Sequence, residues 1–163
     1  MNGGCEKRDK MKRRKTRTVR IGGVRIGGNN PVAIQSMTKV RTSCVGKVAA
    51  QLRLLEKEGC EIIRLSVKDA EDALALRRIK RLTKMPVVAD IHFDWRLALE
   101  AIRSGVDKIR INPGNISDRK NLAQIAAAAL SAGVAVRLGI NSGSLPAGKG
   151  DTVSRMVRGA LYY

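Results

Sequence analysis

The chain has 163 residues and a mass of 17.7 kDa, enough for one hydrophobic core and too short for two. Hydrophobic residues make up 44% of it and charged residues 28%, which is ordinary for a globular protein and excludes wholesale disorder. No run of apolar residues reaches the ~18 that a membrane span needs. No apolar segment follows the first basic residues either, so we expect neither a membrane protein nor a secretory signal.

The charge is unusual and uneven. The 32 Lys and Arg residues against 14 Asp and Glu give a net charge of +18, and residues 1–20 contain nine of the basic residues and two of the acids. Such a segment predicts a solvated basic tail over residues 1–17. An arm that binds nucleic acid or another polyanion through its phosphates is the alternative, although no aromatic residue in the tail offers a base a surface to stack on.

The cysteines exclude two kinds of protein. Cys5, Cys44 and Cys60 are three in number, with no C-x-x-C pair and no nearby histidine cluster. An odd, scattered set argues against a disulfide scaffold and against a metal cluster built from this chain's own residues. We therefore expect the reducing cytoplasm as the location.

Alternating apolar segments on either side of Gly22-Gly23, at 18–21 and 24–26, predict a short β-hairpin. Apolar strand patterns and amphipathic helix patterns then alternate along the chain. The expected strands are 32–37, 62–67, 87–91, 108–111 and 135–140. The expected helices are 45–58, 70–83, 95–104 and 119–132.

The residues at the helix ends support these predictions. Gly59, Gly105 and Gly133 each follow a helix, where a left-handed cap favours glycine. Side chains suited to cap helix amino termini stand at Asp69, at Asp94, and at Ser117 or Asp118. Strands alternating with helices predict an α/β fold with a parallel sheet, preceded by the hairpin.

Polar side chains recur on one face of the predicted strands. Because side chains alternate along a strand, Arg64 shares a face with Ser66, and Asp90 shares one with His92. The face that packs on the helices must be apolar. We therefore expect the polar residues in the lumen of a barrel or at the carboxyl-terminal rim of its strands, where α/β barrels build their sites. The remaining members of this polar set are Arg110 with Asn112, and Arg137 with Gly139 and Asn141.

Arg64, Arg110 and Arg137 would repel one another in one lumen, and Asp90 alone does not balance them. The planar guanidinium suits phosphate oxygens, so the set predicts an anionic ligand, most simply a phosphate or diphosphate. For any single arginine, a structural pairing with a carbonyl group or with Asp90 is an equal alternative. His92, the only histidine, is as compatible with a structural as with a functional role.

Five strings follow one another in a specific order: VRIGG at 24–28, QSMT at 35–38, VADIHF at 88–93, RINPGN at 110–115 and RLGINSGSL at 137–145. In this order they resemble the bacterial 4-hydroxy-3-methylbut-2-enyl diphosphate synthase family of the non-mevalonate isoprenoid pathway. The resemblance runs from about Thr16 to Leu145. It implies a TIM barrel similar to that of dihydropteroate synthase.

The resemblance also implies a substrate, 2-C-methyl-D-erythritol 2,4-cyclodiphosphate, and a two-electron reductive opening of its ring. A [4Fe-4S] cluster in a separate carboxyl-terminal domain would perform the reduction, with flavodoxin or ferredoxin as electron donor. In the family dimer the barrel of one subunit faces the cluster domain of the other. Asp90 and His92 would lie at the substrate rim. The positions implied to contact the diphosphate are Arg64, Arg110, Asn112, Arg137 and Asn141.

The chain also departs from the family. The family's Thr-Asn-Thr after Ser-Met is Thr38-Lys39-Val40 here, and the resemblance ends after Leu145. We expect a partial barrel over 18–145, truncated after about its fifth strand, a divergent segment over 146–163, no iron–sulfur domain, and no activity from this chain alone. Two alternatives remain open: a basic protein that binds nucleic acid or another polyanion, and a different phosphate-binding barrel enzyme.

Overall fold

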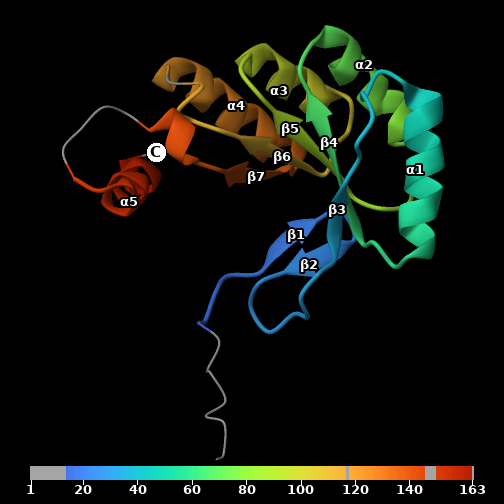
Figure 1. Ribbon diagram of the computed structural model, residues 1–163, viewed down its shortest axis with the longest axis horizontal. Coiled ribbons are helices and arrows are strands. Elements are labelled where there is room, and N and C mark those ends of the chain that lie inside the picture. The colour runs from blue at the N-terminus through green and yellow to red at the C-terminus, as the bar shows by residue number, and fades with distance from the viewer. Residues whose placement is uncertain (1–13, 117, 146–149, 163) are drawn as a thin grey trace, which may run out of the picture.

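The structure is a computed structural model that describes residues 14–116, 118–145 and 150–162 (Figure 1). The strands are β1 (Val19–Ile21), β2 (Val24–Ile26), β3 (Gln35–Met37), β4 (Ile62–Val67), β5 (Val87–Ile91), β6 (Lys108–Ile111) and β7 (Ala135–Leu138). The helices are α1 (Val45–Lys57), α2 (Ala70–Ile79), α3 (Trp95–Arg103), α4 (Arg119–Ala132) and α5 (Thr152–Tyr162), with a 3₁₀ turn at Ser142–Ser144.

A parallel sheet and one layer of helices form the body of the molecule. Strands β3 to β7 pair in chain order, each parallel to the next. Helices α1 to α4 cover one face of this sheet (Figure 1). The prediction of an α/β fold with five parallel strands is confirmed. A closed α/β barrel has eight strands, so the described strands form an arc with edges at β3 and β7.

The helices begin where the sequence predicts. The carboxylates of Asp69, Asp94 and Asp118 accept the backbone N–H groups of the first helical turns at 2.9, 2.9 and 2.8 Å. Ser117, the alternative cap of α4, lies outside the described residues. The glycines that follow α1, α3 and α4 have φ angles of 80°, 83° and 65°, a conformation that side chains with a Cβ rarely adopt. Local sequence therefore sets both ends of α3 and α4 and one end each of α1 and α2.

The main core lies between the sheet and the helices. Alternate strand residues point into it, including Ile63, Leu65 and Val67 on β4 and Ile109 on β6. Apolar residues of all four covering helices pack against them, and Leu76 of α2 is fully buried. This leaves the opposite face of the same strands to carry the polar residues.

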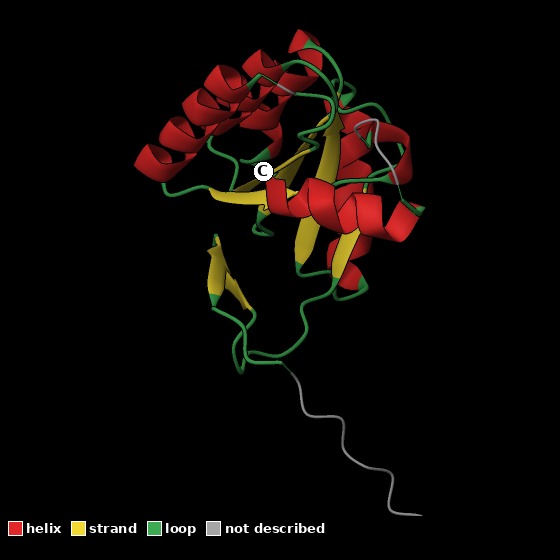
Figure 2. Ribbon diagram, turned by 90° about the vertical axis from the view of Figure 1, so that its left-hand side faces the viewer, coloured by secondary structure: helices red, strands yellow, loops and turns green. Residues whose placement is uncertain are grey.

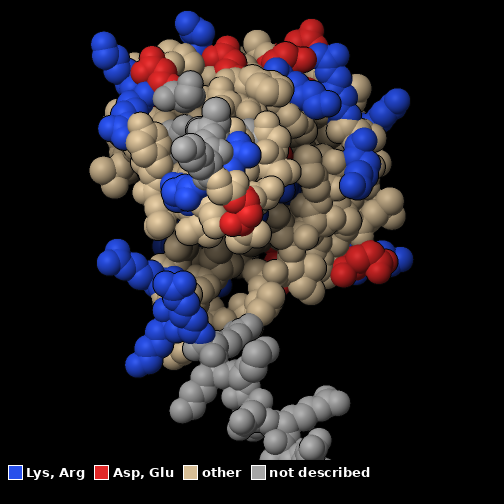
Figure 3. Space-filling view, turned by 60° about the vertical axis from the view of Figure 1, so that its left-hand side comes forward, with Lys and Arg blue, Asp and Glu red and all other residues tan. Residues whose placement is uncertain are grey.

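The hairpin lies beneath the other face of the sheet, at the end where the strands begin (Figure 2). The prediction of antiparallel strands joined by Gly22-Gly23 is confirmed. Ile21 is fully buried there in a small second core with Ile62 and Val88. The basic side chains of the segment that leads into the hairpin gather at this end of the molecule (Figure 3).

Three elements are shorter than predicted by two residues or more, the two strands because their partner strands begin later or end earlier. Strand β3 begins at Gln35 rather than at residue 32, because its partner β4 begins at Ile62 and leaves earlier residues without a strand to pair with. Strand β7 ends at Leu138 rather than at 140, since β6 ends at Ile111. Helix α2 ends at Ile79 rather than at 83, and the amides of Arg81 and Leu82 close tighter turns onto carbonyls three residues back.

Helix α5 was not predicted. It packs through Gly159 near Ile140 and Leu145, beyond the end of β7 and apart from the layer of α1 to α4 (Figure 1). Arg119 lies over the ring of Tyr162, with its Cζ atom 4.8 Å from the ring centre. Within the described ranges, no helix has the length and apolar character needed to cross a membrane.

Candidate anion-binding site

The register of the sheet arranges the side chains of its lumenal face in rows. One row holds Ser66, Asp90, Arg110 and Arg137, which are paired across β4 to β7. The row nearer the start of the strands holds Arg64, Val88, Lys108 and Ala135. These pairings confirm that the polar strand residues share the face turned away from helices α1 to α4.

Asp90 is the centre of the first row. Its carboxylate is almost fully buried and accepts hydrogen bonds from Arg64 Nη2 at 2.5 Å and from Arg110 Nη1 at 3.2 Å. The second Nη of Arg110 donates to the carbonyl oxygen of Gly139, directly after β7, at 3.1 Å. One carboxylate therefore holds two guanidinium groups, and the cluster keeps an excess positive charge.

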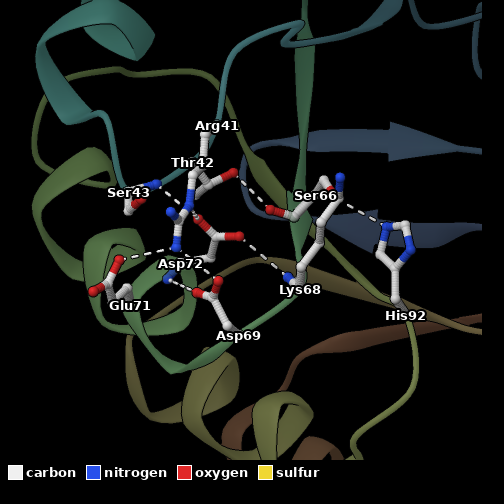
Figure 4. Close-up of polar contacts among 9 residues, drawn as sticks. All are labelled: Arg41, Thr42, Ser43, Ser66, Lys68, Asp69, Glu71, Asp72 and His92. Atoms are coloured by element: carbon white, nitrogen blue, oxygen red, sulfur yellow. Dashed lines mark hydrogen bonds and ion pairs between the residues drawn. The ribbon is translucent and has the colours of Figure 1, made fainter.

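His92 lies just beyond β5, next to this cluster. Its Nε2 is 2.9 Å from the hydroxyl oxygen of Ser66 and 3.9 Å from Asp90 Oδ2. Its carbonyl accepts a hydrogen bond from Asn115 Nδ2 at 2.9 Å. Ser66 was not among the predicted binding residues, although its place on the same face as Arg64 is the signal that could have found it. The ring is thus anchored at one nitrogen (Figure 4), and His92 lies directly after the carboxyl end of β5.

A second polar network fixes the loops above the strands (Figure 4). The buried carboxylate of Asp72 accepts the backbone N–H groups of Ser43 at 2.8 Å and Lys68 at 3.2 Å. Thr42 donates its hydroxyl to the carbonyl of Ser66 at 2.6 Å. Through these bonds the loop after β3 is tied to the loop after β4, directly beside the candidate site.

Arg41 adds two ion pairs on the solvent-exposed side of this network. It donates to Asp69 at 2.8 Å and to Glu71 at 2.9 Å, and both pairs are open to solvent. A backbone N–H bond from Asp72 is the main cause that holds the pKa of Asp69 below its usual value, with Arg41 contributing. Sequence reasoning missed this network, because aspartates in the first turn of a helix are ordinary capping residues.

The other predicted site residues lie around the Asp90 cluster rather than within it. Asn112 is buried, and its Oδ1 accepts the N–H of Gly114 at 3.1 Å, which shapes the loop after β6. Arg137 stands beside Arg110 in the row but forms no ion pair within the part of the chain that is described. Asn141 precedes the 3₁₀ turn and is exposed. The structure thus joins Arg64, Asp90, His92 and Arg110 by direct contacts or through Ser66, and sets the others around them.

Lys108 adds a cation that the sequence analysis did not single out. It is 8% exposed and lies on the lumenal side at the start of β6. Burial lowers the pKa of its ammonium group, and the positive charges of Arg137 and Arg64 lower it further. Four cations of the strands, namely Arg64, Lys108, Arg110 and Arg137, therefore share this face with the single carboxylate of Asp90. An anion is the ligand that such a face favours.

Comparison with known proteins shows the family of the chain. Residues 16–162 match the family described as the GcpE TIM-barrel domain. The chain belongs to this family. The match continues through helix α5, beyond Leu145, where the resemblance was expected to end.

Three similar relatives carry one name. The chain is 49% identical over 133 residues to the 4-hydroxy-3-methylbut-2-en-1-yl diphosphate synthase (flavodoxin) of Caldanaerobacter subterraneus, covering 82% of this chain and 38% of that protein. Proteins of the same name from Geobacillus thermodenitrificans and Thermotoga maritima are 48% identical over 156 residues and 51% over 129. Those alignments cover 93% and 79% of this chain, and 42% and 37% of the relatives. The chain thus spans about two fifths of the length of these relatives.

The described residues do not fit an iron–sulfur cluster. Among them, no three His, Cys, Asp or Glu side chains converge as metal ligands would. Cys44 is exposed and Cys60 is half-buried, and both are free thiols. Cys5 lies outside the described residues. Cluster ligation in a [4Fe-4S] protein takes four side chains, usually cysteines, so this part of the chain is suited to binding an anion and not to holding the cluster.

Proposed function

We propose that the chain forms the diphosphate-binding part of the barrel of a 4-hydroxy-3-methylbut-2-enyl diphosphate synthase. Its ligand would be 2-C-methyl-D-erythritol 2,4-cyclodiphosphate. The observation that carries the proposal is the bridge from Arg64 through Asp90 to Arg110, in a row that retains unbalanced positive charge. The name shared by the relatives, which states a diphosphate product, supports it.

Each residue would have a distinct task. Arg110 and Arg64 would present N–H groups to the diphosphate oxygens, while Asp90 keeps both guanidinium groups in place. His92, held at Nε2 by Ser66, would contact the substrate from the rim. Arg137 and the asparagines Asn112 and Asn141 would complete the site around the anion. Paired charge-assisted hydrogen bonds of this kind are strong and geometrically selective.

The reduction itself would need groups that the described residues do not provide. In this proposal the two electrons would come through a [4Fe-4S] cluster held outside the described residues, with flavodoxin or ferredoxin as the electron donor. The ligands of the cluster would belong to a further domain, which in a homo-oligomer would face this barrel from the partner subunit. This chain alone would then bind the cyclic diphosphate without turning it over.

Calorimetric titration with the cyclic diphosphate tests the binding part of the proposal. We expect saturable binding that Arg110→Gln weakens and Arg103→Gln leaves unchanged. Both variants remove one positive charge, but Arg103 is exposed on α3, near Glu100. Equal effects of the two substitutions, or no binding by the unaltered chain, would contradict it.

Binding of nucleic acid is a second candidate, because one surface favours it. Residues 14–25 contain Arg14, Lys15, Arg17, Arg20 and Arg25 and no acid, and basic side chains gather at this end (Figure 3). Arg20 and Arg25 are directly opposite across the hairpin, an arrangement that bridging phosphates would relieve. Titration with duplex DNA at two salt concentrations separates the candidates, since affinity for a polyanion falls steeply with salt.

A further inference from the structure

Lys108 is a buried cation with no counterion in the part of the chain that the structure describes. It is 8% exposed, and its ammonium group has neither a hydrogen-bond nor an ion-pair partner among the described residues. The positive charges of Arg137 and Arg64 destabilise the charged form of Lys108 further. Arg64 Nε, in the same row, is also buried without a hydrogen-bond partner. Leaving charged groups unpaired away from water is costly, so proteins pair them or bind an ion beside them.

A cavity lies where such an ion would fit. It has a volume of about 500 Å³ and separates the lumenal face of the sheet from the hairpin and the segments around it. Lys108 and Arg137 line it from the sheet, and Thr16, Gly28 and Asn30 line it from the opposite side. No Asp or Glu is among the described residues that line it. The volume is within the range of small-molecule sites.

We propose that this cavity is a second anion-binding site, which takes a small anion of one or two phosphate groups between Lys108 and Arg137. Phosphate oxygens accept from both an ammonium and a guanidinium group, so one such anion offsets the two charges together. In its presence the charged form of Lys108 is stabilised despite its burial.

The site is separate from the rim. Lys108 and Asn112 are four residues apart on and just after β6, which places them roughly 13 Å apart along the strand. Arg137 lies between the two levels, one row above Lys108. Arg137 lines the lower cavity and is also assigned to the rim, so Lys108 is the residue that distinguishes the lower site from the rim.

Titration with inorganic pyrophosphate, and with orthophosphate in parallel, tests the proposal on the whole chain. We expect two pyrophosphate ions to bind, and Lys108→Met to weaken one of them roughly 10- to 100-fold. Lys84→Met is the matched control, because it removes the same charge from an exposed lysine and should leave both ions bound. Arg110→Gln should weaken binding of the other pyrophosphate ion, the one at the rim.

Urea unfolding provides a second readout. In buffer free of polyvalent anions, Lys108→Met should raise the unfolding midpoint, because it removes an unpaired buried charge. Pyrophosphate should then raise the midpoint of the unaltered chain more than that of the variant. If Lys108→Met does not fold, Lys108→Gln takes its place in both measurements.

Three results would overturn the proposal: wild-type affinity and stoichiometry in the Lys108 variants, a single bound pyrophosphate that Arg110→Gln removes, or no binding of either anion. The proposed function fails in a different way, when the cyclic diphosphate does not bind at the rim while the lower site still takes pyrophosphate.

Discussion

Gly139 lies directly against the guanidinium group of Arg110. A Cβ atom on Gly139 would be 2.6 Å from Arg110 Nε and 3.0 Å from Nη2, while the carbonyl of the glycine accepts a hydrogen bond from the same group. The φ angle of Gly139 is not in the left-handed region, so the requirement for glycine here comes from close approach and not from the backbone. The neighbouring strand thereby sets the plane of the arginine that faces Asp90.

Gly139→Ala should therefore displace Arg110 and weaken binding of pyrophosphate or the cyclic diphosphate at the rim by roughly tenfold. The free energy of unfolding should change little, because an arginine end is flexible. Titration calorimetry measures the effect, and Gly46→Ala, where a Cβ meets no atom within 4 Å, is the control. Unchanged affinity in Gly139→Ala would show that the position of the guanidinium does not matter.

Asp90→Asn should destabilise the fold. The substitution removes the one counterion that the described residues give two partly buried arginines, whose side chains are 24% and 18% exposed. Breaking such a pair from one side costs about 3 kcal/mol. Urea unfolding measures the loss, and pyrophosphate should restore part of it by taking the place of the carboxylate. Stability equal to that of the unaltered chain would mean that the arginines are solvated without Asp90.

Lys108 should make stability depend on alkaline pH. Its pKa in the fold is below the ordinary value of 10.5, so between the two values the unfolded chain binds more protons than the folded one. The free energy of unfolding then rises with pH across this interval. Unfolding curves of the unaltered chain and of Lys108→Met, measured without phosphate, should converge as pH approaches 10.5. Parallel pH profiles would contradict the prediction.

The open edge of β7 should promote self-association. Val136 and Leu138 are over a third exposed and line an apolar cavity of about 570 Å³ beside Leu130 of α4. Unpaired edge strands recruit other strands unless a charge interrupts them. Val136→Lys should reduce association in sedimentation velocity, whereas Val153→Lys, on exposed α5, should not. Identical sedimentation of both variants would place the contact elsewhere.

The sequence predicted the elements well because local rules decide them here. Alternation along each strand placed Arg64 and Arg110 on the lumenal face, and the caps at Asp69 and Asp94 positioned α2 and α3. Strand ends were less predictable. Whether Ile34 extends a strand depends on where its partner begins, which no local pattern contains.

The sequence placed Arg64, Asp90 and Arg110 on one face of the sheet but could not show how they pair. Periodicity cannot show that Asp90 divides its carboxylate between Arg64 and Arg110, since that depends on register across three strands. It cannot show the burial of Lys108 either, because that burial arises from the opposite side of the cavity, far away in the sequence. The role of Asp72 was hidden for the same reason: its partners Ser43 and Lys68 lie in two different loops.

The buried carboxylate of Asp72 affects the conformational entropy that is lost when a ligand binds. Asp72 holds the loops after β3 and β4 by hydrogen bonds in the folded protein. The conformational entropy of these loops is therefore lost during folding, before a ligand binds. A preorganised surface loses less affinity to immobilisation than one that must close around its ligand. The backbone of these loops should therefore shift by about 1 Å or less between the free and bound states, and the anion should meet a rim that is already assembled.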